Sequence, residues 1–490
     1  MGSIHSLPPC CGKPLLTALL VSGLFALGGC AQIPDLGPLP ATQAVSSLNS
    51  AHSFSAPASA WPGDGWWKVY ADPQLNTLID EALSHSPSLK EAEARFHMAG
   101  GMVQYAGATR MPEVSGGAYL DEAKQSYNDL MPRQALPQNY NDYGLVGLNM
   151  SWELDFWGKN HAALAAAVSE QQADQVEIAQ ARLLLSASVA SAYAELNHLY
   201  TVRDTYQDTV ALRSKTVELF RQRYQFQLET MASVEQFEAR KSAAETDLRM
   251  VDERIALQKN AIAALLGAGP DRALTIARPT ARIAVSSGLP PQLALDLLGR
   301  RPDVVAARLR TEVAAHRIDQ TKAGFYPSVN LVGLLGLQSL GIHNLGKSGS
   351  DMGDAGVAIS LPIFNTERLQ GQYRGARAEY EMAVANYDAT LDNALHEVAD
   401  VAVSRKALTG ELESTHAAVA AAQKAYTLVN KRYQGKLATY MDVLMAEDEL
   451  VATKRAQADV EARAMVLDVA LARALGGGFQ SPANTNVVNK

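Results

Sequence analysis

The stretch RYQFQLETMASVEQFEA, residues 223–239, recurs 209 positions later as RYQGKLATYMDVLMAED, residues 432–448. The two copies share the opening Arg-Tyr-Gln and, after it, Leu, Thr, Val and Glu at matching places. Each copy reads as the end of one helix, a short turn and the start of a returning helix. After each turn, eight of ten positions spaced alternately three and four residues apart are apolar, from 234 to 265 and from 443 to 474. This period is typical of coiled coils, and a repeat of this length predicts a duplicated, mainly helical fold.

The rest of the chain follows the same duplication. Residues 159–266 contain no Gly or Pro, so the first arm alone can form a helix of roughly 100 Å at 1.5 Å per residue. Pro302 and Pro327 repeat Pro87 and Pro112 at an offset of 215. Each repeat is therefore predicted to run helix, strand, strand, long helix, helix. The four segments with strand character are residues 114–120, 143–155, 329–338 and 356–364.

The strand at residues 143–155 alternates apolar and polar side chains, as expected of a strand with one face in lipid and one in water. Strands of this length suit a tilted crossing of the bilayer. Four strands cannot close, and an open sheet edge in lipid leaves backbone groups unpaired. Two copies would give eight strands with a filled interior, whereas three would give twelve strands with room for a channel. We therefore expect a trimer.

The N-terminus reads as a lipoprotein signal. Residues 15–27 form an apolar run too short to span a bilayer, and the letters LGGC that follow end at Cys30. This resembles a bacterial lipobox, in which the Cys is acylated and becomes the mature N-terminus. Cys10 and Cys11 would leave with the signal, so Cys30 would be the one remaining Cys, and an anchor fits it better than a disulfide. An ordinary signal peptide with an incidental Cys is the alternative. Ala31, in place of an Asp, favours the outer membrane.

These observations divide the chain into six segments. The segments are a signal peptide at 1–29, a lipidated extended linker at 30–60, a first structural repeat at 61–270, a connector at 271–290, a second structural repeat at 291–478 and a C-terminal tail at 479–490.

Five short motifs, in this order and spacing, support a family resemblance. They are WW at 66–67 with DPQL at 72–75, SWELDFWG at 151–158, RRPDV at 300–304, FYPSV at 325–329 and ALGGG at 474–478. With these motifs the chain resembles an outer-membrane factor of the TolC type, in the lipoprotein branch that serves tripartite drug efflux. It departs from the family after Phe364, where Asn365-Thr366-Glu367 stands in place of the usual Asp-Gly-Gly.

The resemblance implies a mainly α fold with a small membrane β part. In that family a homotrimer forms a twelve-stranded β-barrel continuous with a twelve-helix periplasmic α-barrel. It lies in the outer membrane of a Gram-negative bacterium, in contact with outer-membrane lipid, and a large part extends into the periplasm. Its partners are a periplasmic adaptor and an inner-membrane efflux pump.

The favoured function is a passive exit duct for drugs or other small molecules; the sequence does not name the exported compound, the pump or the adaptor. One alternative is a structural coiled-coil lipoprotein that acts as a periplasmic tether, but a tether needs no amphipathic strands. A second is a periplasmic enzyme, but no nucleophile with a convincing base is found, and no cofactor is expected. The net charge of −8 and the lack of a basic patch argue against nucleic acid as a partner, and none is expected.

Three other patterns have simpler explanations. Residues 396–400, His-Glu-Val-Ala-Asp, nearly match the zinc motif H-E-x-x-H, but the second His is missing, so a solvated helix face is favoured and no metal is expected. Gly333 and Gly336 lie in a strand with no helix after it, which favours close packing or a bend. The Trp cluster at 61, 66 and 67 is either a binding platform or, as we favour, packing of the N-terminal part of the chain onto the helices.

The two helical turns are the predicted contact points with the adaptor, because they lie furthest from the strands. The docking residues are Tyr224, Gln227, Leu228, Gln434, Lys436 and Leu437. The resemblance also implies a gate beside the second turn, with Tyr433 and Asp442 at the family positions and Met445 where a second acidic residue is usual. The alternative for Asp442 is a helix N-cap, and the two roles can coexist.

Overall fold

The computed structural model describes residues 32–44, 54, 57–128, 131–281, 288–290 and 293–481. The signal peptide and Cys30 lie outside these residues. The chain divides into two compact units, and each draws on both repeats. One unit contains residues 97–172 and 309–385 with the segment up to residue 41, and the other contains residues 42–96, 173–308 and 386–490.

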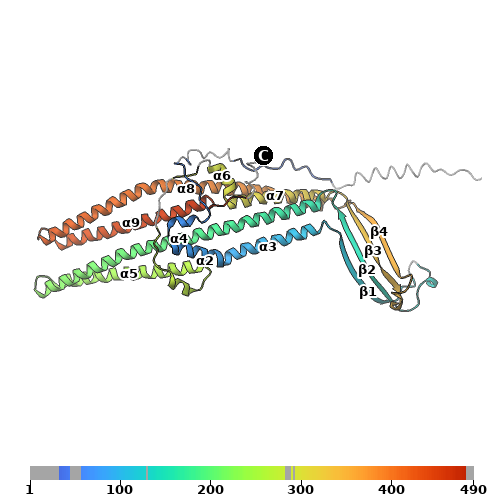
Figure 1. The fold of residues 1–490 in the computed structure, drawn as a ribbon, viewed down its shortest axis with the longest axis horizontal. Helices are drawn as coiled ribbons and strands as arrows, with labels where there is room; N and C mark the ends of the chain where they lie inside the picture. Colours follow the sequence, from blue (N-terminus) through green and yellow to red (C-terminus); the bar gives the residue numbers. More distant parts are fainter. Residues whose placement is uncertain are drawn as a thin grey trace, which may run out of the picture. The chain divides into compact units, whose positions relative to one another are not determined.

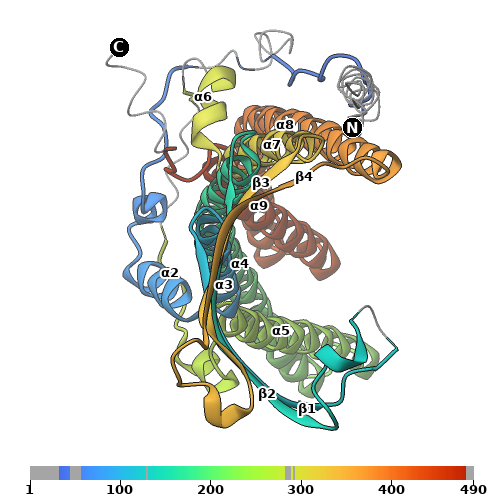
Figure 2. The same ribbon diagram turned by 90° about the vertical axis from the view of Figure 1, so that its right-hand side faces the viewer.

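The first unit is built around one antiparallel sheet of four strands. These are β1 (Glu113–Ala123), β2 (Asn141–Leu154), β3 (Ser328–Leu340) and β4 (Asp351–Ser360), in the spatial order β1-β2-β3-β4. Figure 2 shows the sheet as a curved ribbon with β1 and β4 as its two edges. The strands have 10 to 14 residues, enough to cross the hydrocarbon layer at a tilt.

Three of the four strands lie close to their predicted positions, whereas β4 begins and ends earlier in the chain than predicted. Residues 351–355, which precede the predicted strand at 356–364, also pair with β3, beginning with Asp351 opposite Leu337. Gly341 and Gly349, both with positive φ, shorten the connection so that pairing starts early. The strand also ends at Ser360 rather than Phe364, because Pro362 has no N–H to donate to a ladder.

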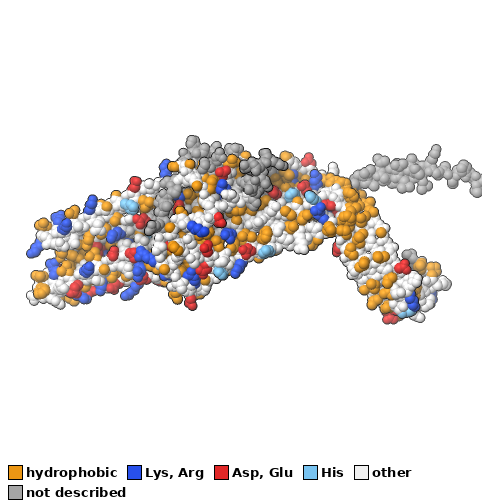
Figure 3. All heavy atoms as spheres, in the orientation of Figure 1, with side chains coloured by type: hydrophobic (Ala, Val, Ile, Leu, Met, Phe, Trp, Pro, Cys, Tyr) orange, Lys and Arg blue, Asp and Glu red, His pale blue; other side chains and the backbone are white. Residues whose placement is uncertain are grey.

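The strand register separates the side chains onto two faces. One face is mostly apolar, with Trp152, Leu331 and Val357 in one row and Leu154, Val329 and Ile359 in the next. The opposite face is more polar: it carries Glu153, Asn330 and Ala358 in one row, and Ser115, Asn149, Leu334 and Asp354 in another. The alternation predicted for residues 143–155 is therefore confirmed for β2. Figure 3 shows hydrophobic side chains gathered over the strands.

A row of glycines crosses three strands of the sheet. Gly117, Gly147 and Gly336 lie opposite one another. A Cβ at Gly336 would lie 2.5 Å from the Val146 carbonyl oxygen and 2.8 Å from the Gly147 Cα, which no side chain tolerates. A Cβ at Gly333 would meet its nearest atom at 3.6 Å, an ordinary contact. Close packing thus explains Gly336 but not Gly333.

Long helices make up most of the rest of the chain. They are α4 (Lys159–Gln225), α5 (Met231–Leu265), α8 (Thr366–Gln434) and α9 (Tyr440–Ala474). Figure 1 shows α4 turning back into α5 and α8 turning back into α9. Shorter helices are α2 (Pro73–His85), α3 (Pro87–Ala108), α6 (Leu293–Arg300) and α7 (Pro302–Ala323). In the described ranges, none of these helices combines the length and apolarity that a membrane crossing requires.

The motif Asp72-Pro73 anchors the helical core of the second unit. Asp72 is the N-cap of α2 and accepts a hydrogen bond from the Gln74 N–H at 2.9 Å. Its carboxylate also accepts from the Tyr193 hydroxyl and the Thr280 N–H, both at 2.8 Å. Burial by itself would raise the pKa of Asp72, but these hydrogen bonds outweigh it and hold the pKa below its usual value.

The motif Arg300-Arg301-Pro302-Asp303 ties three helices of the second unit together. The buried Arg301 pairs with Asp303 at the start of α7 and with Glu397 of α8, at 2.5 and 2.8 Å, and it donates to the Ala474 carbonyl at the end of α9. Glu397 therefore belongs to an ion-pair network, with Arg473 as a second partner at 3.5 Å. No three His, Cys, Asp or Glu side chains of the described chain are grouped to hold a metal ion.

The three tryptophans of the predicted N-terminal cluster lie in the second unit. Trp66 and Trp67 are 8% and 7% exposed and belong to the largest apolar cluster. Trp61 is half-buried, with the Arg300 guanidinium 4.7 Å from its ring centre. These positions favour packing over a binding platform.

We predict that Gly336→Ala weakens the sheet by roughly 1–3 kcal/mol, because the added methyl group meets backbone atoms that cannot move aside. The measurement is the thermal stability of the purified, assembled protein. Gly333→Ala is the matched control on the same strand and should behave like the parent. Equal losses in both variants would show that close packing at Gly336 is not the reason for its glycine.

Candidate functional site

The two helical turns in the second unit share one backbone design. Gln227 and Lys436, which match at the repeat offset, both adopt positive φ, at 55° and 60°. In the first turn the N–H groups of Gln227 and Leu228 donate to the carbonyls of Tyr224 and Arg223, and the second turn repeats this pattern. This is a Schellman motif, which ends a helix by satisfying its last carbonyls. The match between the two turns in the sequence is therefore explained by the hydrogen bonds that each turn must make.

The returning helices begin in the same way. Thr230 and Thr439 are the N-caps of α5 and α9, and each hydroxyl accepts from the N–H three residues later. Asp442 completes a capping box, because its carboxylate accepts from the Thr439 N–H at 2.8 Å. Asp442 thus stands three residues inside the helix and is not the N-cap itself. The Thr439 hydroxyl and backbone, in that order, hold the pKa of Asp442 below its usual value, so it is ionised at neutral pH.

The outer surface of the turns is apolar and exposed. Tyr224 is 45% exposed, Leu228 is 66% exposed and Leu437 is 71% exposed. Phe226, which sequence reasoning did not single out, is 75% exposed. Gln227, Gln434 and Lys436 are also exposed and surround these side chains with polar groups. An exposed apolar patch with a polar rim is typical of a protein interaction surface.

Aromatic side chains join the two hairpins just behind the turns. Tyr440 of α9 contacts Phe220 of α4 and Phe237 of α5, with ring centroids 4.9 and 5.3 Å apart. The Tyr440 hydroxyl hydrogen-bonds the Thr216 hydroxyl, and burial raises the pKa of Tyr440 to about 12. Tyr433, the predicted gate tyrosine, accepts a hydrogen bond from Arg223 at 2.5 Å. The second hairpin is therefore fixed against the first within one chain.

A buried ion pair adds to this connection. Arg213 of α4 lies 3.4 Å from Glu447 and 2.8 Å from Asp448, both on α9. The Glu447 side chain is only 2% exposed, and its burial raises its pKa while Arg213 opposes that rise. Sequence reasoning matched Glu447 with Glu238 but assigned it no role. Glu238 instead pairs with Arg221 on α4 of its own hairpin.

Asp442 and Met445 lie on the exposed side of α9. Met445 is 67% exposed, and Asp442 is also exposed beyond its capping bonds. Tyr433 is half-buried in the contact between hairpins. Tyr433 therefore belongs to the contact between the hairpins, whereas Asp442 and Met445 lie on a surface of α9 that is exposed in one copy of the chain.

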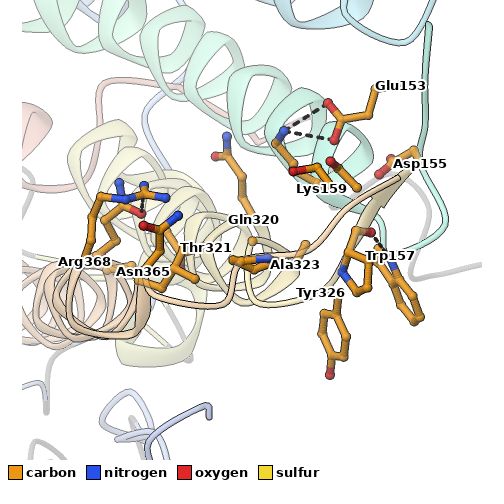
Figure 4. Close-up of a pocket in the computed structure, with 18 of the residues that line it drawn as sticks. Glu153, Asp155, Trp157, Lys159, Gln320, Thr321, Ala323, Tyr326, Asn365 and Arg368 are labelled. Atoms are coloured by element: carbon orange, nitrogen blue, oxygen red, sulfur yellow. Dashed lines mark hydrogen bonds and ion pairs between the residues drawn. The ribbon is translucent and has the colours of Figure 1, made fainter. Parts of the chain in front are cut away.

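A second candidate region lies in the first unit, where strands meet helices. A cavity of about 800 Å³ is lined by the ends of β2, β3 and β4 and the adjoining turns of α4, α7 and α8. Glu153, Ser328 and Ser360 line it, and all three belong to the polar face of the sheet. Figure 4 shows Lys159 reaching Glu153, at 3.0 Å. The polar face therefore continues into a charged, water-accessible hollow.

The motif residues at 151–158 and 325–329 build the wall of this cavity. Asp155 accepts from the N–H groups of Asn160 and His161 and so caps α4. The Trp157 ring stacks on Tyr326 at 4.6 Å, and its N–H donates to the Pro327 carbonyl at 2.8 Å (Figure 4). These contacts join the strand-to-helix connection after β2 to the helix-to-strand connection before β3.

Comparisons with known proteins agree with this arrangement. The family model described as outer membrane efflux protein matches residues 78–268 and 293–477. The multidrug resistance outer membrane protein MdtP of Escherichia coli K12 is 27% identical over 475 residues, which cover 95% of this chain and 97% of MdtP. The fusaric acid resistance protein FusA of Burkholderia cepacia is 32% identical over 377 residues, with 75% and 70% covered.

Solved structures give the same picture. The outer membrane protein VceC of Vibrio cholerae is 45% identical, with a TM-score of 0.81, over 86% of this chain and 100% of VceC. The outer-membrane channel OprN is 25% identical, also with a TM-score of 0.81, over 92% of this chain and 99% of OprN.

We predict that Arg213→Met loosens the contact between hairpins by about 3 kcal/mol, because it leaves the Glu447 carboxyl buried without its partner. Hydrogen exchange of the amides in residues 440–450 reports the change. Arg221→Met is the matched control on the same helix. Its pair with Glu238 is more exposed, so the loss should stay below about 1 kcal/mol. Similar exchange rates in the two variants would show that the buried pair does not hold the hairpins together.

Proposed function

We propose, on the premise that this chain belongs to the outer membrane efflux protein family, that three copies close into one duct supplied by a periplasmic adaptor and an inner-membrane pump. The chain is an outer-membrane efflux channel of a Gram-negative bacterium, and the family is one of channels rather than enzymes. The family forms homotrimers that work with efflux systems. The proposal adds to this a periplasmic adaptor and an inner-membrane pump as the partners of the channel.

The observation that supports a duct is the four-stranded sheet, which has one apolar face, one polar face and two open edges. Twelve strands from three copies would turn the apolar faces to lipid and enclose the polar faces around water. Neither a coiled-coil tether nor a periplasmic enzyme requires such a sheet. Because the duct is passive, the pump supplies the energy.

The names of relatives suggest the cargo. MdtP is a multidrug resistance protein and FusA a fusaric acid resistance protein. We therefore take the cargo of this duct to be drugs or other small organic molecules.

The lipid anchor at Cys30 is part of the proposal. Residue 30 itself lies outside the described part of the chain, but the segment after it is placed within the first unit. The Gln32 carbonyl accepts from Gln370 at 3.0 Å, and Arg377 donates to the carbonyls of Leu36 and Pro38. Residues 32–38 of the predicted tether therefore lie along α8, at residues that follow the end of β4 by 10 to 17 positions. An acyl chain on Cys30 would then enter the membrane beside the sheet.

We predict that the two turns dock the adaptor. Cysteines at Gln227 or Lys436 should crosslink to an adaptor carrying a cysteine in its own hairpin tip, because both positions are exposed at the ends of the helices. The assay is crosslinking in cells that also produce the adaptor and the pump of the same efflux system. Val69, which is 60% exposed next to the buried Trp67, provides a control site away from the turns. Crosslinking from Val69→Cys alone would place docking elsewhere.

We predict that Asp442 and Met445 line the gate. In a trimer, three Asp442 carboxylates would lie near the axis, and their repulsion would be relieved by bound cations. Asp442→Ala should therefore weaken the block of single-channel current by multivalent cations, and Met445→Asp should strengthen it.

The capping box gives this experiment its internal control. Thr439→Ala removes the cap but keeps the carboxylate, and it should lower stability by about 1 kcal/mol without changing the block. If Asp442→Ala and Met445→Asp both conduct and block like the parent, while Asp442→Ala is less stable, then Asp442 acts only as a capping residue.

A further inference from the structure

The cavity between strands and helices in the first unit is lined by three carboxylates, and each of them has a partner among the described residues. Glu153 accepts hydrogen bonds from Lys159 with both oxygens, at 3.0 Å. Asp155 accepts from two backbone N–H groups at the start of α4, where the helix dipole also offsets its charge. Glu379 lies 3.6 Å from Arg317. None of these carboxylates therefore depends on a further cation.

Arg368, in the first turn of α8, is the remaining cation of the cavity, and it has no carboxylate partner in the described part of the chain. Its guanidinium is exposed and donates one hydrogen bond, to the Gln372 side chain at 3.4 Å. A guanidinium has several N–H donors, and a pair of them fits the oxygens of a carboxylate. Figure 4 shows Arg368 at the end of the cavity away from Glu153 and Asp155. Positive charge is therefore in excess at that end.

The residue just before α8 contributes to this excess. Asn365 lines the cavity at the same end as Arg368 (Figure 4), and it stands where the outer-membrane factor family usually has Asp. An aspartate there would place a carboxylate at the end of the cavity that Arg368 occupies. The amide of Asn365 carries no charge and can itself donate a hydrogen bond to an acceptor. The departure of this chain from its family therefore leaves the guanidinium available to an anion from outside the chain.

The cavity also has the size and the apolar surface that an organic anion needs. Its volume of about 800 Å³ lies within the range of small-molecule sites. The stacked rings of Trp157 and Tyr326 line the end away from Arg368 (Figure 4), and they are 50% and 39% exposed. An anion with a flat apolar body thus finds a cation at one end and aromatic surface at the other.

We propose that this cavity binds organic carboxylates on their way through the duct, and that Arg368 is the residue that holds the carboxylate. The proposal rests on the proposed duct, in which the polar face of the sheet that lines the cavity faces the water-filled interior. It deepens that function by naming an anionic class of cargo. Because Arg368 is exposed, the affinity should be modest and should fall as salt is added. Neutral molecules of the same shape lack the group that the guanidinium recognises.

Binding of 4-fluorobenzoate to the full-length protein in zwitterionic nanodiscs, followed by fluorine NMR, tests the proposal. The parent should broaden or shift the 4-fluorobenzoate signal much more than that of 4-fluorobenzamide, its neutral analogue. Arg368→Gln should weaken binding of the benzoate by about tenfold, because a charge-assisted hydrogen bond is lost. Asn365→Asp should also weaken it, because the new carboxylate competes for Arg368, and Asp is as good as Asn before a helix, so the fold is kept.

Arg374→Gln is the matched control, because Arg374 is exposed on the same helix but does not line the cavity. It should bind 4-fluorobenzoate like the parent. Equal binding by the parent, Arg368→Gln and Asn365→Asp would overturn the proposal. So would equal binding of the benzoate and the benzamide, an equal loss in Arg374→Gln, or no binding by the parent.

Single-channel recording of the same protein separates this failure from a failure of the duct. A parent that conducts but does not bind 4-fluorobenzoate overturns the carboxylate site and leaves the duct intact. A parent that forms no conducting channel contradicts the proposed duct itself, and with it the carboxylate site.

Discussion

The structure depends on the backbone hydrogen bonds at the two edges of its sheet. In the chain as described, β1 and β4 each pair on one side only, so their other N–H and C=O groups have no partner in the sheet. Water can satisfy such groups, but the hydrocarbon layer cannot. Joining β4 of one copy to β1 of the next removes every edge at once. Such a closure would also give the two faces of the sheet different surroundings, lipid for the apolar face and water for the opposite one.

The duplicated sequence gives the two hairpins the same turns but different surroundings. The Schellman motifs and threonine caps are equivalent in both, because they depend only on residues within a few positions. The matching glutamates differ, since Glu238 pairs near the surface and Glu447 pairs with Arg213 in the interior. A movement that separates the second hairpin from the first must break the Arg213–Glu447 pair and the contacts of Tyr433 and Tyr440. The asymmetry therefore lies in tertiary contacts and not in the repeat itself.

Local signals in the sequence were sufficient for most of the fold. The first pair of long helices could be predicted because residues 159–266 contain no Gly or Pro, and β2 could be predicted from its alternation. The start of β4 could not, because it is set by the pairing of Asp351 with β3 and by the turn at Gly349. For Asp442 the sequence suggested a cap at the wrong place, since the cap is Thr439. The partner of Glu447 was missed because Arg213 is 234 residues away in the chain.

The closed sheet is the central claim, and amide hydrogen exchange of the assembled protein in membranes measures it most directly. If β4 pairs with β1 of the next copy, the amides of β1 and β4 should exchange as slowly as those of β2 and β3 along their whole length. An open edge gives a different result, because every second amide of an edge strand then points away from its neighbour and is not hydrogen-bonded. Fast exchange at alternate residues of β1 and β4, with slow exchange throughout β2 and β3, would contradict the account.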